Sequence, residues 1–128
     1  MAKGYFFPDP FIYTGYFTKN NNQNKTYESF IMDYEKLVQK RQGSDKARYE
    51  KPKTIRFNGK EAQEHVYEVY QAKPRGPLFT TEYWLKAKFI VVKAKDGFFV
   101  LAYKSPREFY DNYLAIFKEV VKSFKTVD

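Results

Sequence analysis

The sequence predicts an α+β fold, specifically an α/β/α sandwich with two helices and a central antiparallel sheet of about 4–6 strands. Three observations predict it. Apolar residues recur at three- and four-residue spacing over about 27–41 and about 106–122, as in amphipathic helices. Strand-like segments bounded by turn residues lie before and between them. One of the hairpins is apolar on both faces, so that part of the sheet needs cover on both sides.

The first strand and the first helix are read from the N-terminal third. Residues 11–17 have strand composition, and the prolines in 6–10 make that stretch irregular or an edge. The polar run 20–24 is typical of a surface loop. Thr26 is a suitable N-cap for a helix over about 27–41, and Gly43 is a suitable stop. Its apolar stripe comprises Tyr27, Phe30, Ile31, Tyr34, Leu37 and Val38.

A hairpin follows at Asn58-Gly59, because a type I′ turn favours this dipeptide. We expect the second strand to run to about Gln71, where the segment 73–77 with its two prolines ends it. Two of the expected cross-strand pairs join opposite charges, which favours this register. The expected pairs are Phe57–Lys60, Arg56–Glu61, Ile55–Ala62 and Lys53–Glu64.

The doubly apolar hairpin spans 82–103 and turns at Asp96-Gly97. One face carries Ile90, Val92, Phe99, Leu101 and Tyr103, and the other carries Leu85, Ala87, Phe89, Val91, Val100 and Ala102. A last helix is expected from Pro106, with Ser105 and Glu108 forming a capping box. Its expected stripe comprises Phe109, Tyr113, Ile116, Phe117, Val120, Val121 and Phe124.

Length and composition indicate a single domain over 1–128. The absence of cysteine excludes disulfides, thiolate zinc sites and a cysteine nucleophile. No apolar run approaches the ~18 residues of a membrane helix, and the start lacks the apolar stretch of a signal peptide. We therefore expect a soluble chain.

Residues with catalytic potential are sparse. His65 is the only histidine, and its strand neighbour Glu64 should point to the opposite face, so the two would not form a base–orienter pair. Glu64 and Glu68 share a face, which we interpret as a charged rim. Nucleophile elbows, phosphate loops and dinucleotide fingerprints are absent. We therefore expect no enzymatic activity, no cofactor and no metal site.

Positive charge is concentrated in one segment. Nine basic residues lie between Lys36 and Lys60 against two acidic ones, and they account for most of the net charge of +8. Such a segment either binds an anionic partner or is a solvated loop. Tyr49 and Phe57 are its only aromatic residues, which disfavours a platform for stacking bases. The candidate binding residues are Lys46, Arg48, Lys51, Lys53 and Arg56.

Trp84 is a second candidate contact. On a strand, Trp84, Lys86 and Lys88 share one face, where lysine stems could pack over the indole. An exposed tryptophan often marks a partner contact, and core packing is the alternative.

From Thr26 onward, the order of parts resembles the PsbP-like family, which includes an extrinsic protein of photosystem II. The closing strand, Asp-Gly turn, strand and helix ending at 121–124 are the most specific part. The stretches that carry the resemblance are TYESFIMDYEKLVQK, KTIRFNGKEAQEHVYEVY, YWLKAKFIVVKAKDGFFVLAY and SPREFYDNYLAIFKEVVKSFK.

The resemblance implies an α/β/α sandwich and a non-enzymatic accessory role, often in an exported or membrane-associated protein. Related Mog-type members bind a small GTPase. The family's N-terminal hairpin is either trimmed from this chain or absent from a minimal version of the family. We therefore expect a protein-interaction module, extracytoplasmic or membrane-associated if the N-terminus is trimmed and cytoplasmic otherwise. The alternative is a binder of nucleic acid or anionic lipid through 36–60.

Overall fold

The computed structural model describes residues 10–18, 26–41, 43–57, 59–74, 77–78 and 80–124. A strand and a helix come first, two short strands follow, and three long strands precede the last helix. The elements are β1 (Phe11–Thr18), α1 (Tyr27–Arg41), β2 (Ala47–Tyr49), β3 (Lys53–Phe57), β4 (Lys60–Pro74), β5 (Thr80–Ala94), β6 (Gly97–Pro106), a short 3-10 helix (Arg107–Phe109) and α2 (Tyr110–Ser123).

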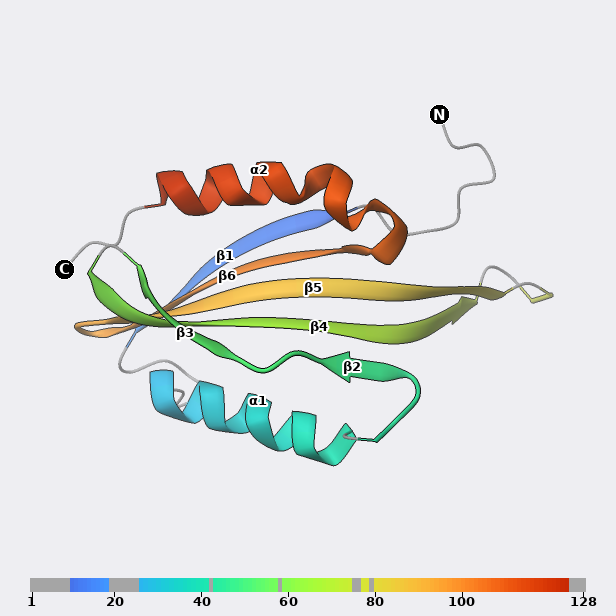
Figure 1. Ribbon diagram of the computed structural model, residues 1–128, viewed down its shortest axis with the longest axis horizontal. Helices are drawn as coiled ribbons and strands as arrows, with labels where there is room; N and C mark the ends of the chain where they lie inside the picture. The colour runs from blue at the N-terminus through green and yellow to red at the C-terminus, as the bar shows by residue number, and fades with distance from the viewer. Residues whose placement is uncertain are drawn as a thin grey trace.

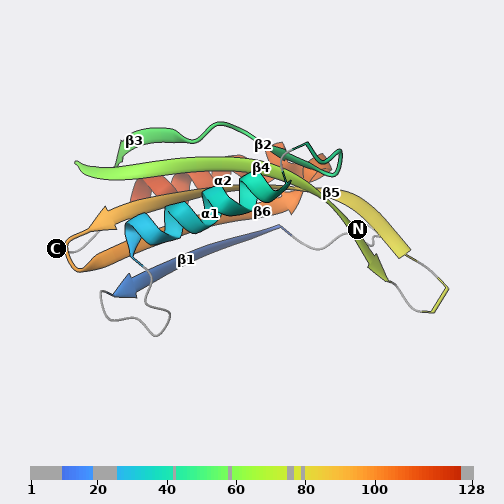
Figure 2. The same ribbon diagram turned by 90° about the horizontal axis from the view of Figure 1, so that it is seen from below.

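The described strands form one antiparallel sheet of six strands, ordered β1-β6-β5-β4-β2 with β3 also paired to β4. The α+β class and the antiparallel sheet are thereby confirmed. Figure 1 shows α1 and α2 on opposite faces of the sheet, and β4 and β5 extending beyond both helices at one end. In Figure 2, seen from the α1 side, β1 lies along one edge of the sheet and β2 and β3 along the other.

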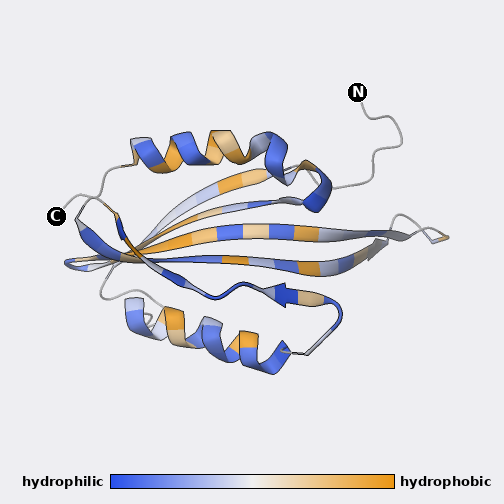
Figure 3. Ribbon diagram, viewed as in Figure 1, coloured by the Kyte–Doolittle hydropathy of each residue, from blue (hydrophilic) through white to orange (hydrophobic). Residues whose placement is uncertain are grey.

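Each face of the sheet carries its own core. Figure 3 shows hydrophobic bands recurring between hydrophilic ones along both helices. Because side chains alternate along a strand, neighbouring residues of β5 and β6 enter different cores, as the sequence predicted. The α2-side core contains Phe57, Ala62, Ile90, Val92, Leu101, Tyr103, Tyr110 and Phe117. The α1-side core contains Tyr27, Ile31, Phe89, Val91, Phe98, Val100 and Ala102.

Helix α1 has the predicted bounds and cap. The Ser29 amide donates to Thr26 Oγ1 at 3.0 Å, and the Thr26 amide donates back to Ser29 Oγ at 2.8 Å. This reciprocal pair satisfies two amides at the helix start. Gly43 follows the helix at φ 88°, a left-handed conformation that favours glycine. Neither of the described helices combines the length and apolar character needed to cross a membrane.

The predicted start of the last helix is wrong. Ser105 and Pro106 remain in β6, paired with Lys86 and Leu85 of the long strand β5. The buried Ser105 hydroxyl donates to the Pro106 carbonyl at 2.9 Å, and no side chain caps the 3-10 helix or α2. The capping box does not form because continued strand pairing holds Ser105 in the sheet, and α2 begins only at Tyr110.

The buried face of α2 differs in part from the predicted stripe. Tyr113 and Ile116 are 42% and 53% exposed. Phe117 is buried as predicted, with its ring centroid 5.6 Å from that of Tyr103. The Tyr103 hydroxyl donates to the Tyr110 carbonyl at 2.7 Å, which anchors the helix start to β6. The residues of the helix and its end that pack on the core are Tyr110, Leu114, Phe117, Val121 and Phe124.

The hairpin register was predicted correctly, and the strand ends were not. Phe57 pairs with Lys60 and Lys53 with Glu64, and Gly59 has φ 79°. Strand β4 continues to Pro74, beyond the predicted end near Gln71. Strand β2 occupies part of the basic segment and was not predicted. The expectations for 6–9 and 20–24, and for Asn58, lie outside the described residues.

Replacing Phe117 by alanine should lower the free energy of unfolding by about 3–5 kcal/mol, because it empties a buried aromatic site. Replacing the neighbouring Ile116, which is 53% exposed, should change it by less than about 0.5 kcal/mol. Urea denaturation of both variants measures the difference. Equal losses would contradict this orientation of α2.

Candidate functional site

A basic and aromatic cluster lies on the α2 side of the sheet, where β2, β4, β5 and the 3-10 helix meet. Glu68 pairs with Arg48 of β2 and with Lys86 of β5, and Tyr70 pairs with Trp84. Because paired residues point to the same face, the register itself gathers these side chains. We call the following residues the Trp84 cluster: Lys46, Arg48, Glu68, Tyr70, Trp84, Lys86 and Arg107.

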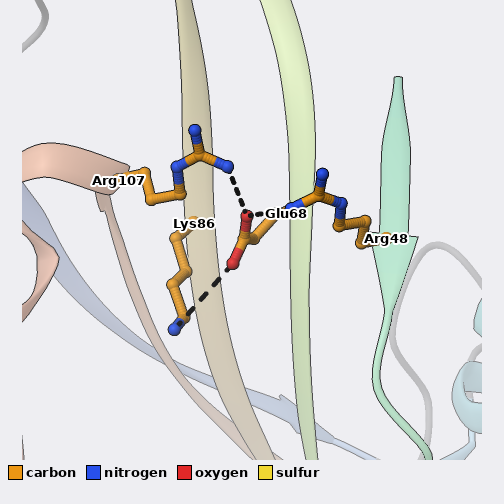
Figure 4. A network of polar contacts seen from close by, with 4 residues as sticks. All are labelled: Arg48, Glu68, Lys86 and Arg107. Atoms are coloured by element: carbon orange, nitrogen blue, oxygen red, sulfur yellow. Dashed lines mark hydrogen bonds and ion pairs between the residues drawn. The ribbon is translucent and has the colours of Figure 1, made fainter. Parts of the chain in front are cut away.

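Three cations share the Glu68 carboxylate (Figure 4). Arg107 donates to Oε1 at 3.1 Å, whereas the nearest nitrogen of Arg48 lies 3.9 Å from the same oxygen. Lys86 Nζ lies 4.0 Å from Oε2. The Arg48 side chain is 68% exposed, against 19% for Glu68. One carboxylate cannot neutralise three cations, so the cluster retains positive charge that faces solvent.

The indole of Trp84 lies beneath two guanidinium groups. The guanidinium carbons of Arg48 and Arg107 are 5.0 and 5.1 Å from its ring centre, within range of a cation–π interaction. The Tyr70 ring meets the indole edge-on, with centroids 5.8 Å apart. Lys46 Nζ lies 5.5 Å from the Tyr70 ring centre. Cations and aromatic rings thus alternate across the surface.

Two further contacts define the border of the cluster. The Tyr70 hydroxyl donates to the Glu82 carboxylate, and this hydrogen bond raises the pKa of Tyr70. Lys86 Nζ lies over the ring of Tyr110 at 4.5 Å. The cations that lie over the indole are therefore the arginines Arg48 and Arg107. Lys86 contacts the first residue of α2 instead.

The structure separates the five predicted basic residues. Lys46 and Arg48 belong to the Trp84 cluster, and Lys53 shares the α2-side face at its pair with Glu64. Lys51 is exposed between β2 and β3. Arg56 alternates to the other face and donates to the Gly59 carbonyl at 3.0 Å. The segment therefore does not form one basic patch.

Arg107 was not singled out from the sequence. It lies 59 positions after Arg48, and only the pairing of β2 with β4, β4 with β5 and β5 with β6 brings the two together. The predicted shared face of Glu64 and Glu68 is correct. Glu64 pairs with Lys88 at 3.3 Å, so both carboxylates are engaged by cations of β5.

His65 is buried on the α1 side of the sheet, on the opposite face from the Trp84 cluster. It is 1% exposed, stacks on Phe89 at 4.7 Å and meets the edge of Tyr34 from α1 at 4.7 Å. Neither ring nitrogen has a hydrogen-bond partner among the described residues. Burial lowers the pKa of His65 from 6.5 to about 4, with a smaller opposing effect from Glu64. His65 is therefore neutral at physiological pH.

Within the described ranges, no group of three or more His, Asp or Glu side chains is arranged to hold a metal ion. No family model matches the chain, and no curated protein matches it. A similar fold occurs in the crystal structure of PA94 from Pseudomonas aeruginosa, a protein of unknown function for which a regulatory role has been suggested. The TM-score is 0.61 at 8% identity, covering 94% of this chain and 86% of that one. At this identity, the likeness shows the fold alone.

The buried His65 should make folding sensitive to acid. The unfolded chain takes up a proton near pH 6.5, whereas the folded chain resists protonation until about pH 4. The unfolded state binds more protons between these values, so the free energy of unfolding should fall by up to about 3 kcal/mol as pH drops through this window.

Replacing His65 by phenylalanine keeps a ring against Phe89 and removes this titration. Urea denaturation from pH 7 to pH 4 should therefore show a shallower loss of stability in the variant than in the parent. Parallel curves for the two proteins would show that His65 does not titrate as described.

Proposed function

We propose that this chain is a non-catalytic protein-interaction module, and that its Trp84 cluster binds an acidic segment of a protein partner. The single observation that carries this proposal is the pair of guanidinium groups over Trp84, both converging on Glu68. Tryptophan, tyrosine and arginine are the residue types that dominate binding energy at protein interfaces. Here all three meet on one partly exposed surface.

The positive charge of the Trp84 cluster supports an acidic partner. Arg48 and Lys86 lie 3.9 and 4.0 Å from Glu68, too far for strong hydrogen bonds, so their donors can turn to a second carboxylate. Arginine binds carboxylates through two parallel hydrogen bonds, which favours aspartate or glutamate side chains as ligands. The indole and the Tyr70 ring supply apolar area beside them.

We further propose that the layers form the α/β/α sandwich of the PsbP-like family. Helices on opposite faces of the sheet and a separate core beneath each of them support this (Figure 1). Within that family resemblance, the module belongs to an extracytoplasmic or membrane-associated setting. Its role there is accessory, acting through the partner that it holds.

Nucleic acid or anionic lipid bound through 36–60 is the alternative. The positions of the basic residues disfavour it, since Arg56 points to the opposite face from Arg48. A base that stacked on Trp84 would also have to displace a guanidinium group. A polyanion attracted by the whole segment 36–60 would not distinguish Arg48 from Arg56. Substitutions at these positions therefore separate the two hypotheses.

Trp84 is the only tryptophan, so intrinsic fluorescence reports directly on the cluster. Titration with a short poly-glutamate peptide should change this signal and saturate. Arg48→Glu combined with Arg107→Glu should weaken binding at least about tenfold, because two charge-assisted contacts are reversed. Glu68→Gln should strengthen it by releasing the three cations. The double variant matched to this charge change, Arg56→Glu with Lys118→Glu, lies outside the cluster and should bind nearly as the parent does.

Equal weakening by the matched double variant would contradict the proposal, because it would indicate attraction by net charge alone. Single-stranded DNA and phosphatidylserine vesicles serve as competing probes in the same assay. Tighter binding of either than of the acidic peptide, with loss in Lys51→Glu, would establish the alternative instead.

A further inference from the structure

An open cleft lies on the α1 side of the sheet, on the opposite face from the Trp84 cluster. Its volume is about 530 Å³, which lies within the range of small-molecule sites. Elements from across the whole sheet line it: α1 on one side, β1 on another, and β2, β4, β5 and β6 beneath. It is separate from the surface proposed to bind a protein partner.

The cleft exists because a small side chain lies between larger ones. Ala102 of β6 pairs with Tyr13 of β1 and with Phe89 of β5. All three residues line the cleft. The aromatic walls around Ala102 also include the following residues: Phe11, Tyr34, Tyr49 and Tyr67.

Helix α1 does not fill the hollow. Its first half packs on the sheet through Tyr27 and Ile31, which are buried. Further along, Leu37 lines the cleft and is still 40% exposed. Phe11 and Tyr13 of the edge strand β1 are 50% and 45% exposed as well. Apolar area thus remains accessible on two sides of one concave site, along α1 and along β1.

The charges at the cleft have one sign. Among the described residues that line it, Arg41 and Lys104 are the only charged ones, and both are cations. Lys104 Nζ lies 5.9 Å from the Phe11 ring centre, and Arg41 ends α1. Burial raises the pKa of Tyr67, an effect that Arg41 opposes, and burial also raises the pKa of Tyr34. These phenols remain neutral and can hydrogen-bond to a polar group of a ligand.

Size separates a small molecule from a peptide helix. Two turns of helix about 10 Å across and about 11 Å long occupy roughly 850 Å³, so the open cleft could receive only part of such a helix. An apolar cavity of about 150 Å³ accepts one benzene ring, so this cleft accommodates on the order of twenty carbon atoms. A single aliphatic chain fits within that limit.

We propose that the cleft binds an amphipathic carboxylate, with its apolar chain over Leu85 and Ala102 and its carboxylate at Arg41 and Lys104. Three features of the cleft support this ligand: both charged lining residues are cations, the walls are apolar, and the volume suits one aliphatic chain. Nothing in this proposal depends on the Trp84 cluster, so either site can fail its test independently of the other.

Dodecanoate is the probe, and dodecanol is its uncharged counterpart. Titration of the isotope-labelled protein, followed by two-dimensional NMR, should show saturable dodecanoate binding with shifts at the lining residues Leu85, Val100 and Ala102. Dodecanol should bind at the same residues about tenfold or more weakly, because it lacks the charge-assisted contacts. Arg41→Ala and Lys104→Ala should each weaken dodecanoate binding severalfold and leave dodecanol binding unchanged. Lys118→Ala, on the exposed side of α2, is the matched control and should have no effect.

Filling the cleft provides an independent variant. Ala102→Phe should abolish binding of both probes, and its own NMR spectrum shows whether the fold is kept. Dodecanoate that fails to bind, or that binds Arg41→Ala and Lys104→Ala as it binds the parent, would overturn the proposal. So would a concentration-dependent dimer that the cleft-filling variant dissociates, since a second copy would then occupy the cleft.

Discussion

The antiparallel register of β4, β5 and β6 is the constraint on which the rest of the structure depends. Side chains alternate along each strand, so the pairing of Ala62 with Val92 commits every even-numbered residue of β4 and β5 to the α2 side. The same register places Tyr70 beside Trp84. A slip of one residue would exchange the two faces, and it would move Lys86 and Lys88 to the α1 side and Phe89 to the α2 side.

Local sequence signals predicted the pairing of β3 with β4 well and the ends of the strands poorly. The dipeptide Asn58-Gly59 predicted this pairing, since a two-residue turn leaves one register. Ser105 misled the prediction of α2 because the residues match a capping box, and only the length of β5 shows that Ser105 still has a strand partner. Tyr113 and Ile116 are exposed because α2 turns Tyr110, Leu114 and Phe117 toward the core.

The candidate site shows a similar division. Arg48 and Trp84 were each recognisable by residue type, but as separate features, since nothing in the linear sequence joins them. Arg107 carried no signal of its own, because its place beside Arg48 arises from strand pairing and from a 3-10 turn. The cleft could not be predicted from the sequence either, since Ala102 was recognisable only as an apolar position. Its small size matters only when the walls on either side are known.

The register therefore separates two surfaces of different chemistry, a charged one beside α2 and an apolar one beside α1. Nuclear Overhauser effects from the Trp84 indole test this arrangement most directly, because each face offers different neighbours. We expect cross-peaks from the indole protons to the side chains of Arg48, Tyr70 and Arg107. Cross-peaks from the indole to Tyr34 or Leu37 of α1 would place Trp84 on the other face and contradict the described register.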